Sequence, residues 1–212
     1  YLETGMIYMT RLFLIAILLG SCSSLPISYK DLPKDIYRLT FGYPNVEVTQ
    51  GIFNSYPYSF AKVGFGKGQS VIMILESIDD NLFTWVGQDG VKLITKNGRV
   101  IKSMGLPHDV DIKPSIHRDN FASGEYFEVV NFSHPILLNA DLLSFIEFKE
   151  LSNLIYLENK MSVNVFTENI AIENIGWSNE NIYYLDSSNR VIKTTQHLHP
   201  FLDQMHIEFY LK

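Results

Sequence analysis

Apolar and polar residues alternate along most of this chain with the period of two that is typical of β-strands. The alternation is regular over residues 142–148, whereas residues 69–78 form a dense apolar run typical of a strand buried on both faces. Strands are predicted at 46–53, 58–65, 69–78, 84–86, 91–95, 99–103, 126–132, 142–148, 154–157, 161–166, 170–177 and 207–211, with a further hairpin at 182–194. The pattern predicts an all-β fold, an antiparallel meander of hairpins that forms a sandwich or an open barrel.

The best-defined hairpin lies at residues 91–103, where Asn97-Gly98 separates two runs rich in β-branched and apolar residues. Asn-Gly between such runs is the strongest short hairpin signal in a sequence. A two-residue loop would pair Leu93 with Lys102, whereas a three-residue loop would pair Leu93 with Ile101. Because apolar cross-strand pairs stabilise a sheet, we prefer the three-residue loop.

The hairpin at residues 182–194 aligns with the first one without a gap, and both contain Arg-Val-Ile-Lys at the same place. Asn189 stands where Gly98 stands, and asparagine is the next-best residue for a positive φ. The two hairpins therefore suggest a β architecture built from related pieces. The same register would pair Tyr184 with Ile192 and Leu185 with Val191.

The N-terminal part of the chain is predicted to be an export signal. Arg11 precedes an unbroken apolar run at residues 12–19, which is shorter than the roughly 20 residues that a membrane span needs. Leu19-Gly20-Ser21-Cys22 resembles the lipobox of bacterial lipoproteins, in which the peptide is cut before a cysteine that carries a diacylglycerol. We therefore expect a signal peptide over residues 1–21 and lipidation of Cys22, which is the only cysteine.

After Cys22 we expect a tether over residues 22–28 and a single β domain over residues 29–212. One short helix is predicted at residues 31–41, where Asp31 can cap the first turn. The residue after Cys22 is not the aspartate that is associated with inner-membrane retention, and this resembles sorting to the outer membrane. The expected location is the outer membrane, with the domain facing the periplasm.

Charge excludes two classes of partner. The chain carries 17 basic and 23 acidic residues, a formal net charge of −6, and the basic residues form no cluster. Binding to nucleic acid or to a membrane surface through a polybasic segment is therefore not expected.

The polar segment at residues 108–124 is the one cluster of side chains with catalytic chemistry. It contains Asp109, Asp111, His117 and Arg118, and two of its carboxylates with its histidines could hold a metal. No motif such as His-Glu-x-x-His occurs, and carboxylates in loops are usually solvated. We favour an ordinary loop, and we predict no metal, cofactor or catalytic residue.

Three other features also have ordinary interpretations that we favour. His197 and His199 could form a ligand pair on one strand face, but the proline that follows suggests a strand end and exposed histidines. The glycine-rich segment 64–68 precedes a strand, so it is a turn rather than a phosphate loop. Trp85 and Trp177 could stack on sugar rings, although aromatic residues in strands more often belong to the core.

Three blocks of the sequence, residues 55–78, 84–110 and 189–212, resemble the YjbF/GfcB family, the lipoproteins of group 4 capsule and related exopolysaccharide operons. The pieces Trp-Val-x-x-Asp-Gly-Val and Gly-Leu-Pro carry much of this resemblance, and the lipobox also fits. The resemblance implies an all-β periplasmic domain on the outer membrane that takes part in the synthesis or export of a surface polysaccharide. Lipidation of Cys22 is the one residue role that it transfers.

Two functions follow from these observations. The first is a non-enzymatic accessory whose partners are the membrane, through its lipid, and an outer-membrane β-barrel, another periplasmic protein of the operon, or the polysaccharide. The second is a glycan hydrolase or lyase that uses carboxylates of the loop at residues 108–119. For either function, the side chains that could contact the glycan or a partner protein are Trp85, Asp109, Asp111, His117, Arg118 and Trp177.

Acylation of Cys22 predicts that the protein incorporates radiolabelled palmitate and fractionates with membranes. The variant Cys22→Ala should lose the label, because its side chain has no thiol to acylate, while Ser23→Ala should keep it. A wild-type protein that stays unlabelled and fractionates as freely diffusing would contradict the lipid anchor.

Overall fold

The computed structural model describes residues 47–113, 115 and 121–212. The predicted signal peptide, the lipidation site Cys22, the tether and the helix at residues 31–41 lie outside this part. His117 and Arg118 of the polar loop lie outside it as well. No helix in the described ranges is long and apolar enough to cross a membrane.

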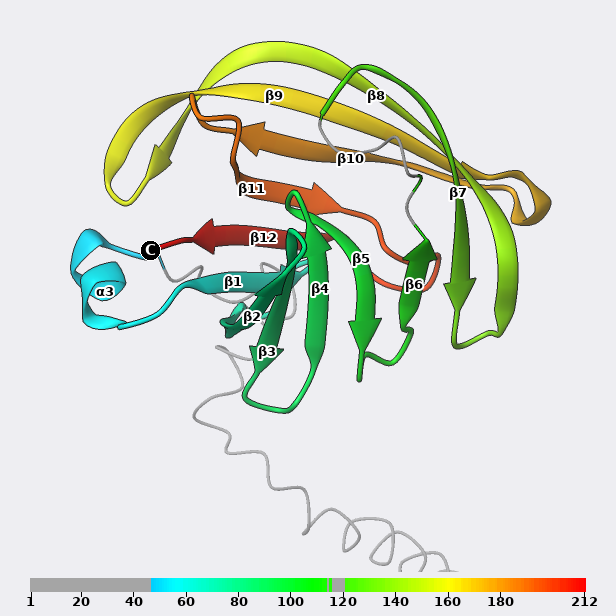
Figure 1. Cartoon of the computed structure of the whole chain (residues 1–212), viewed down its shortest axis with the longest axis horizontal. Coiled ribbons are helices and arrows are strands. Elements are labelled where there is room, and N and C mark those ends of the chain that lie inside the picture. Colours follow the sequence, from blue (N-terminus) through cyan, green and yellow to red (C-terminus); the bar gives the residue numbers. More distant parts are fainter. Residues whose placement is uncertain (1–46, 114, 116–120) are drawn as a thin grey trace, which may run out of the picture. The chain divides into compact units, whose positions relative to one another are not determined.

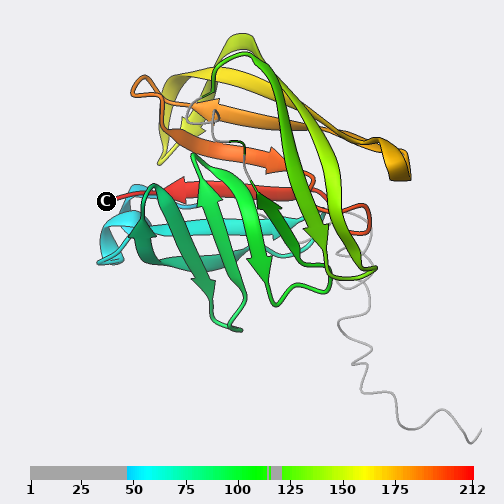
Figure 2. The same cartoon turned by 45° about the vertical axis from the view of Figure 1, so that its right-hand side comes forward.

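The part of the chain that the structure describes forms a closed antiparallel barrel of twelve strands (Figures 1 and 2). Each strand pairs with its neighbours in the sequence, and β1 closes the ring by pairing with β12 from Phe60 opposite Tyr210 to Phe65 opposite Met205. The predicted all-β meander is confirmed, and its two ends meet. The strands are β1 (Phe60–Phe65), β2 (Val71–Asp79), β3 (Leu82–Gly87), β4 (Lys92–Lys96), β5 (Arg99–Met104), β6 (Val110–Lys113), β7 (Gly124–Phe132), β8 (Leu137–Tyr156), β9 (Asn159–Ile172), β10 (Trp177–Leu185), β11 (Val191–Gln196) and β12 (Met205–Tyr210).

The prediction of a strand at residues 46–53 is wrong, because the helix α3 (Gln50–Ser55) begins within this segment. The side chain of Thr49 caps the helix by accepting a hydrogen bond from the backbone N–H of Ile52. Phe53 then packs near Phe60 of β1 and Tyr210 of β12, with ring centroids 6.4 and 6.5 Å apart. The helix therefore depends on a cap and on a contact with distant strands, neither of which the alternation of residues reports.

The predicted strand at residues 170–177 is also wrong in part. Strand β9 ends at Ile172, a single 3₁₀ turn, η1, covers Glu173–Ile175, and β10 begins at Trp177. Gly176 ends the turn with a φ of 62°, the left-handed conformation that favours glycine. This segment is therefore the reversal between two strands.

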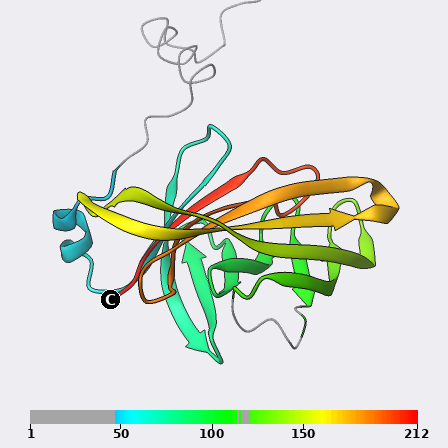
Figure 3. The same cartoon turned by 90° about the horizontal axis from the view of Figure 1, so that it is seen from above.

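The long hairpin of β8 and β9 arches over the barrel and reaches the end where α3 lies (Figures 1 and 3). Near its tip, Tyr156 stacks on Tyr210 with ring centroids 5.3 Å apart and donates a hydrogen bond to the backbone oxygen of Phe209. Glu158 in the turn accepts a hydrogen bond from the backbone N–H of Gln50. These contacts hold the hairpin tip against the end of the barrel.

The hairpin between β4 and β5 does not adopt the preferred register. Lys96 faces Arg99 across a two-residue loop, and Asn97 and Gly98 both have positive φ. A bulge at Ile101 then shifts the pairing, so Leu93 lies opposite Ser103 rather than Ile101 or Lys102. The bulge is the physical reason for the error, because it lets Leu93 face the barrel interior without an apolar partner directly opposite.

The second hairpin, between β10 and β11, has the predicted three-residue loop with Asn189 at a φ of 60°. Leu185 lies opposite Val191 as predicted, but Tyr184 lies opposite Lys193 because a bulge leaves Ile192 unmatched. The bulges at Ile101 and Ile192 occupy equivalent places in the two aligned hairpins. The repeated sequence therefore encodes a repeated bulge, although the two loops differ in length.

The two related hairpins meet inside the barrel. Strands β5 and β11 lie on opposite sides of the ring, with five strands between them in either direction. The side chain of Gln196 joins them by accepting a hydrogen bond from the N–H of Val100 and donating one to the backbone oxygen of Gly98, both at 2.9 Å. Val191 packs directly against Gly98. Opposite walls of the barrel are therefore in direct contact near its centre.

Gly98 is required at this meeting point for two reasons. Its φ is +75°, and a Cβ atom there would lie 2.5 Å from Cγ1 of Val191. Gly90 has a similar φ of +83° but has open space around the same position. We expect Gly98→Ala to lower the free energy of unfolding by about 2–4 kcal/mol, through strain and overpacking together.

Gly90→Ala is the matched control, and its strained φ alone should cost about 1 kcal/mol. Urea unfolding followed by circular dichroism measures both variants. Equal losses would show that the contact between the two hairpins adds nothing to stability.

Candidate functional site

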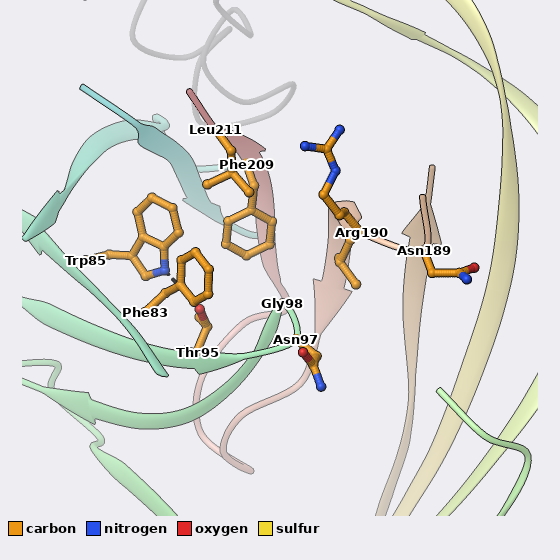
Figure 4. A pocket seen from close by; sticks show the side chains of 10 residues that line it. Phe83, Trp85, Thr95, Asn97, Gly98, Asn189, Arg190, Phe209 and Leu211 are labelled. Atoms are coloured by element: carbon orange, nitrogen blue, oxygen red, sulfur yellow. Dashed lines mark hydrogen bonds between the residues drawn. The ribbon is translucent and has the colours of Figure 1, made fainter. Parts of the chain in front are cut away.

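A cleft of about 160 Å³ opens beside the point where the two hairpin loops meet (Figure 4). Its walls come from β3, from β4 and the loop that follows it, from the loop between β10 and β11 with the start of β11, and from the end of β12. Three aromatic rings lie on one side of it, and an arginine lies at its rim. The lining residues are Phe83, Trp85, Thr95, Asn97, Gly98, Asn189, Arg190, Val191, Phe209 and Leu211.

The floor of the cleft is a packed aromatic layer. Trp85 lies parallel to Phe83 with ring centroids 6.1 Å apart, and it contacts Phe209 at 5.4 Å. The indole N–H of Trp85 donates to Oγ1 of Thr95 at 2.9 Å, so the polar atom of the indole is satisfied within the protein. Trp85 is only 1% exposed, whereas Phe83 is half-buried. Phe83 is therefore the ring that faces the cleft, and Trp85 supports it.

The rim of the cleft carries Arg190, whose side chain is 63% exposed. Its Nε and Nη2 atoms donate to one oxygen of Asp186 at 3.0 and 2.8 Å. The other oxygen of Asp186 accepts hydrogen bonds from the backbone N–H groups of Ser188 and Arg190. Burial alone would raise the pKa of Asp186, but these hydrogen bonds and the guanidinium charge lower it below its ordinary value. The carboxylate therefore stays ionised and fixes the direction of the guanidinium.

Figure 4 shows the side chains of Asn97 and Asn189 directed away from the aromatic rings, while the guanidinium of Arg190 points toward the side of the view on which Leu211 lies. Arg190 is therefore the charged group at the rim of the cleft. Its second edge, which includes Nη1, carries N–H donors for which the described residues supply no acceptor. Flat apolar rings beside oriented donors can bind a small molecule that is apolar on one face and polar at its edge.

A second group of polar residues lies inside the other half of the barrel. Nη2 of Arg99 contacts carboxylate oxygens of Glu128 at 2.8 Å and Glu168 at 3.1 Å, and all three side chains are almost completely buried. Burial by itself lowers the pKa of Arg99, but the two carboxylates raise it above its ordinary value. Glu168 also accepts hydrogen bonds from Ser144, Asn181 and Tyr183. The cluster is sealed from solvent, and it leaves Nη1 of Arg99 buried without a hydrogen-bond acceptor among the described residues.

The alternation of apolar and polar residues along the chain did not predict this cluster. Its members occupy inward positions on β5, β7, β8, β9 and β10, and they meet only when the ring closes. The one signal in the sequence was the presence of charged or polar residues at positions where the alternation places the core.

Asp109 and Asp111, the two predicted carboxylates, have ordinary structural partners. Asp109 accepts hydrogen bonds from the Ser103 hydroxyl and from the backbone N–H groups of Gly105 and Leu106. Asp111 lies on β6 in an exposed ion pair with Lys102 at 3.3 Å. Within the described ranges, no three His, Cys, Asp or Glu side chains lie close enough to hold a metal. Asp109 thus fixes a turn, and Asp111 lies on an exposed surface.

His197 and His199 do not form a pair on one strand face. Strand β11 ends at Gln196, so both histidines follow the strand, as the proline after them suggested. The prediction that both are exposed is wrong for His199, which is buried and stacks on His108 with ring centroids 4.8 Å apart. It also contacts the edge of Phe132 at 4.3 Å.

The two tryptophans are far apart in the ring. Trp177 begins β10 and packs edge-on against Phe132 at 6.2 Å, whereas Trp85 lies on β3 beside the cleft. Both tryptophans pack against the hydrophobic core, which was the preferred interpretation. Only Trp85 is brought to the candidate site.

Comparisons with known proteins agree with this fold. The described residues define the class of protein as an all-β domain folded into a closed antiparallel barrel with a small cleft. The family model "Group 4 capsule polysaccharide lipoprotein gfcB, YjbF" matches residues 34–210, so this chain belongs to that family, as the sequence resemblance predicted.

Two lipoproteins of Escherichia coli K12 are similar in sequence. YjbF is 23% identical over 197 residues, which cover 88% of this chain and 90% of YjbF. GfcB is 27% identical over 77 residues, which cover 36% of each chain. The crystal structure of the E. coli K12 lipoprotein YmcC superposes with a TM-score of 0.69 at 19% identity, over 89% of this chain and 98% of that one, and this likeness supports the fold.

Burial of His199 predicts a dependence of stability on pH. Burial and, to a smaller extent, the charge of His108 together lower the pKa of His199 to about 4. Between about pH 6.5, the ordinary pKa of histidine, and about pH 4, residue 199 therefore binds a proton in the unfolded chain but not in the folded protein. The free energy of unfolding should be full above pH 6.5 and should fall as the pH drops toward 4.

His199→Phe should flatten this slope, since phenylalanine keeps the ring stack and cannot titrate. His134→Gln, at an exposed histidine, is the control and should leave the slope unchanged. Some slope will remain, because burial also lowers the pKa of His206. Urea unfolding at a series of pH values measures the slope of the free energy of unfolding against pH. If His199→Phe shows the same slope as the wild-type protein, the pH dependence does not come from His199.

Proposed function

We propose that this protein is a non-enzymatic accessory in the production or export of a surface polysaccharide. It is held at the outer membrane by lipid on Cys22, with its barrel in the periplasm. The observation that carries the proposal is membership of the group 4 capsule polysaccharide lipoprotein family over residues 34–210. The lipobox that precedes the matched region supplies the anchor.

The environment of the carboxylates supports an accessory rather than a glycan-cleaving enzyme. Glycoside hydrolysis usually needs two carboxyl groups on either side of the scissile bond, one of them in surroundings that keep it protonated. Asp109 accepts three hydrogen bonds within its own turn, and Asp111 is exposed beside a lysine. Glu128 and Glu168 are buried against Arg99, where a glycan chain has no access.

The outer surface of the barrel offers places for a protein partner. Most strands in the described ring pair on both sides, but β8 pairs with β7 only as far as Ile146, and residues 147–156 pair with β9 alone. Leu151 and Ile155 are exposed along this part of β8. A strand edge with exposed apolar side chains is suited to pairing with a strand of another protein, such as an outer-membrane β-barrel or a periplasmic component of the operon.

The proposal predicts that deletion of the gene reduces the polysaccharide on the cell surface. Cys22→Ala should reduce it as well, because the barrel would no longer be concentrated at the membrane. Quantitative staining or immunoblotting of surface polysaccharide measures both strains, with Ser23→Ala as the matched control that keeps the anchor. Normal amounts of polysaccharide in the deletion strain would refute the role.

The enzymatic alternative is tested separately. The purified full-length protein should leave the length of the polysaccharide unchanged in size-exclusion chromatography. Shortening that disappears with Asp111→Asn would favour a hydrolase or lyase over the accessory role.

A further inference from the structure

We propose that the cleft beside Phe83 and Arg190 is a binding subsite for one pyranose ring of the polysaccharide. This inference rests on the proposed function, because it names the ligand that the barrel would contact. The ring would lie against Phe83 and Leu211, and its hydroxyl or carboxylate groups would accept hydrogen bonds from Arg190.

The size of the cleft fits one six-membered ring. Its volume is about 160 Å³, close to the roughly 150 Å³ of an engineered protein cavity that accommodates benzene. Sites for drug-sized molecules usually measure about 300–1,000 Å³. The cleft can therefore admit a single sugar unit of a chain whose neighbouring units remain in solvent.

The chemistry of the walls matches the two sides of a sugar ring. One side of a pyranose presents C–H groups, which pack on apolar and aromatic surfaces, while its edge carries hydroxyl groups. Phe83 and Leu211 supply the apolar surface, since both are half-buried and both line the cleft. Arg190 supplies planar donors at the rim, and the carboxylate of Asp186 holds them in place.

The same walls fit an acyl chain less well. A fatty acyl chain needs a long apolar groove with no polar group along it, whereas this cleft is short and has a guanidinium at its rim. A protein side chain is the remaining alternative, and the experiment below distinguishes it. The family model's description, which names a capsule polysaccharide, favours the sugar.

The site is also rigid before any ligand arrives. Gln196 fixes the loop at Gly98, and the hydrogen bonds to Asp186 fix the loop that carries Arg190. Trp85 is immobilised by its hydrogen bond to Thr95 and supports Phe83 from behind. A preformed site loses little entropy on binding, which a ligand as small as one sugar ring requires.

Saturation-transfer NMR on the full-length protein in a zwitterionic detergent tests the proposal, since glycosidic detergents would compete for the site. The probes are the methyl glycosides of glucose, galactose and glucuronic acid, together with size-fractionated polysaccharide from the strain that carries the gene. We expect saturation of ring protons in at least one probe. Affinity for that probe should fall at least tenfold in Phe83→Ala and in Arg190→Ala.

Leu211→Trp provides an independent test, because it fills the cleft without removing Phe83 or Arg190. It should also weaken binding at least tenfold, while thermal unfolding confirms that the variant is folded. Phe127→Ala, which removes a ring that is 73% exposed on the outer face of β7, is the matched control and should change the affinity less than twofold.

Each outcome decides between the alternatives. Binding that depends on the three cleft residues supports the subsite, even if deletion of the gene leaves the surface polysaccharide unchanged, a result that would overturn only the accessory role. No saturation transfer to any probe, or equal binding in the cleft variants, overturns the subsite. Absence of sugar binding, together with loss of a cross-linked protein partner in the cleft variants, overturns it in favour of a protein side chain.

Discussion

The contact between β5 and β11 across the inside of the barrel is the constraint on which the rest of the structure depends. A ring of about eight strands can be filled by its own side chains, whereas much larger rings enclose a channel. This ring has twelve strands within the described part of the chain, so a circular cross-section would leave a space too wide to fill. Gln196 removes that space by joining the loop at Gly98 and the start of β5 to the opposite wall.

On the two sides of the contact, one continuous hydrophobic core differs in its side chains. The half that includes β3 and β12 is filled by aromatic rings around Trp85, and it opens into the cleft. The half that includes β7 and β9 is filled by apolar side chains around the paired charges of Arg99, Glu128 and Glu168. Buried charges are tolerated when they are paired and hydrogen-bonded, and Nη2 of Arg99 is paired with both carboxylates, whereas its Nη1 has no acceptor among the described residues. The polar residues therefore occupy the closed half, and the accessible site lies in the other.

In the proposed role, the barrel acts through its surface rather than as a container. Its interior is packed, and we propose the cleft and the exposed part of β8 as the places where it meets other molecules. A cleft for one ring would bind weakly by itself, but a polysaccharide presents the same unit many times, and the proposed lipid anchor would keep the protein near the membrane. Weak, repeated contacts of this kind would suit the proposed accessory role.

The sequence by itself determined the β class, most of the strands, the turn residues Gly98 and Asn189 and the family, whereas lipidation of Cys22 stays a prediction. These features depend on local patterns, namely a period of two, residues that tolerate positive φ, and short motifs. Only the tertiary structure decided the registers of the two hairpins, because the bulges at Ile101 and Ile192 respond to packing inside the closed ring. It also decided that Thr49 begins a helix, that Glu168 meets Arg99, and that Phe83 lies beside Arg190. The ion pair and the cleft depend on residues far apart in the chain, and the helix needs contacts with β1 and β12 in addition to its local cap. Such long-range contacts are defined only when β1 has paired with β12.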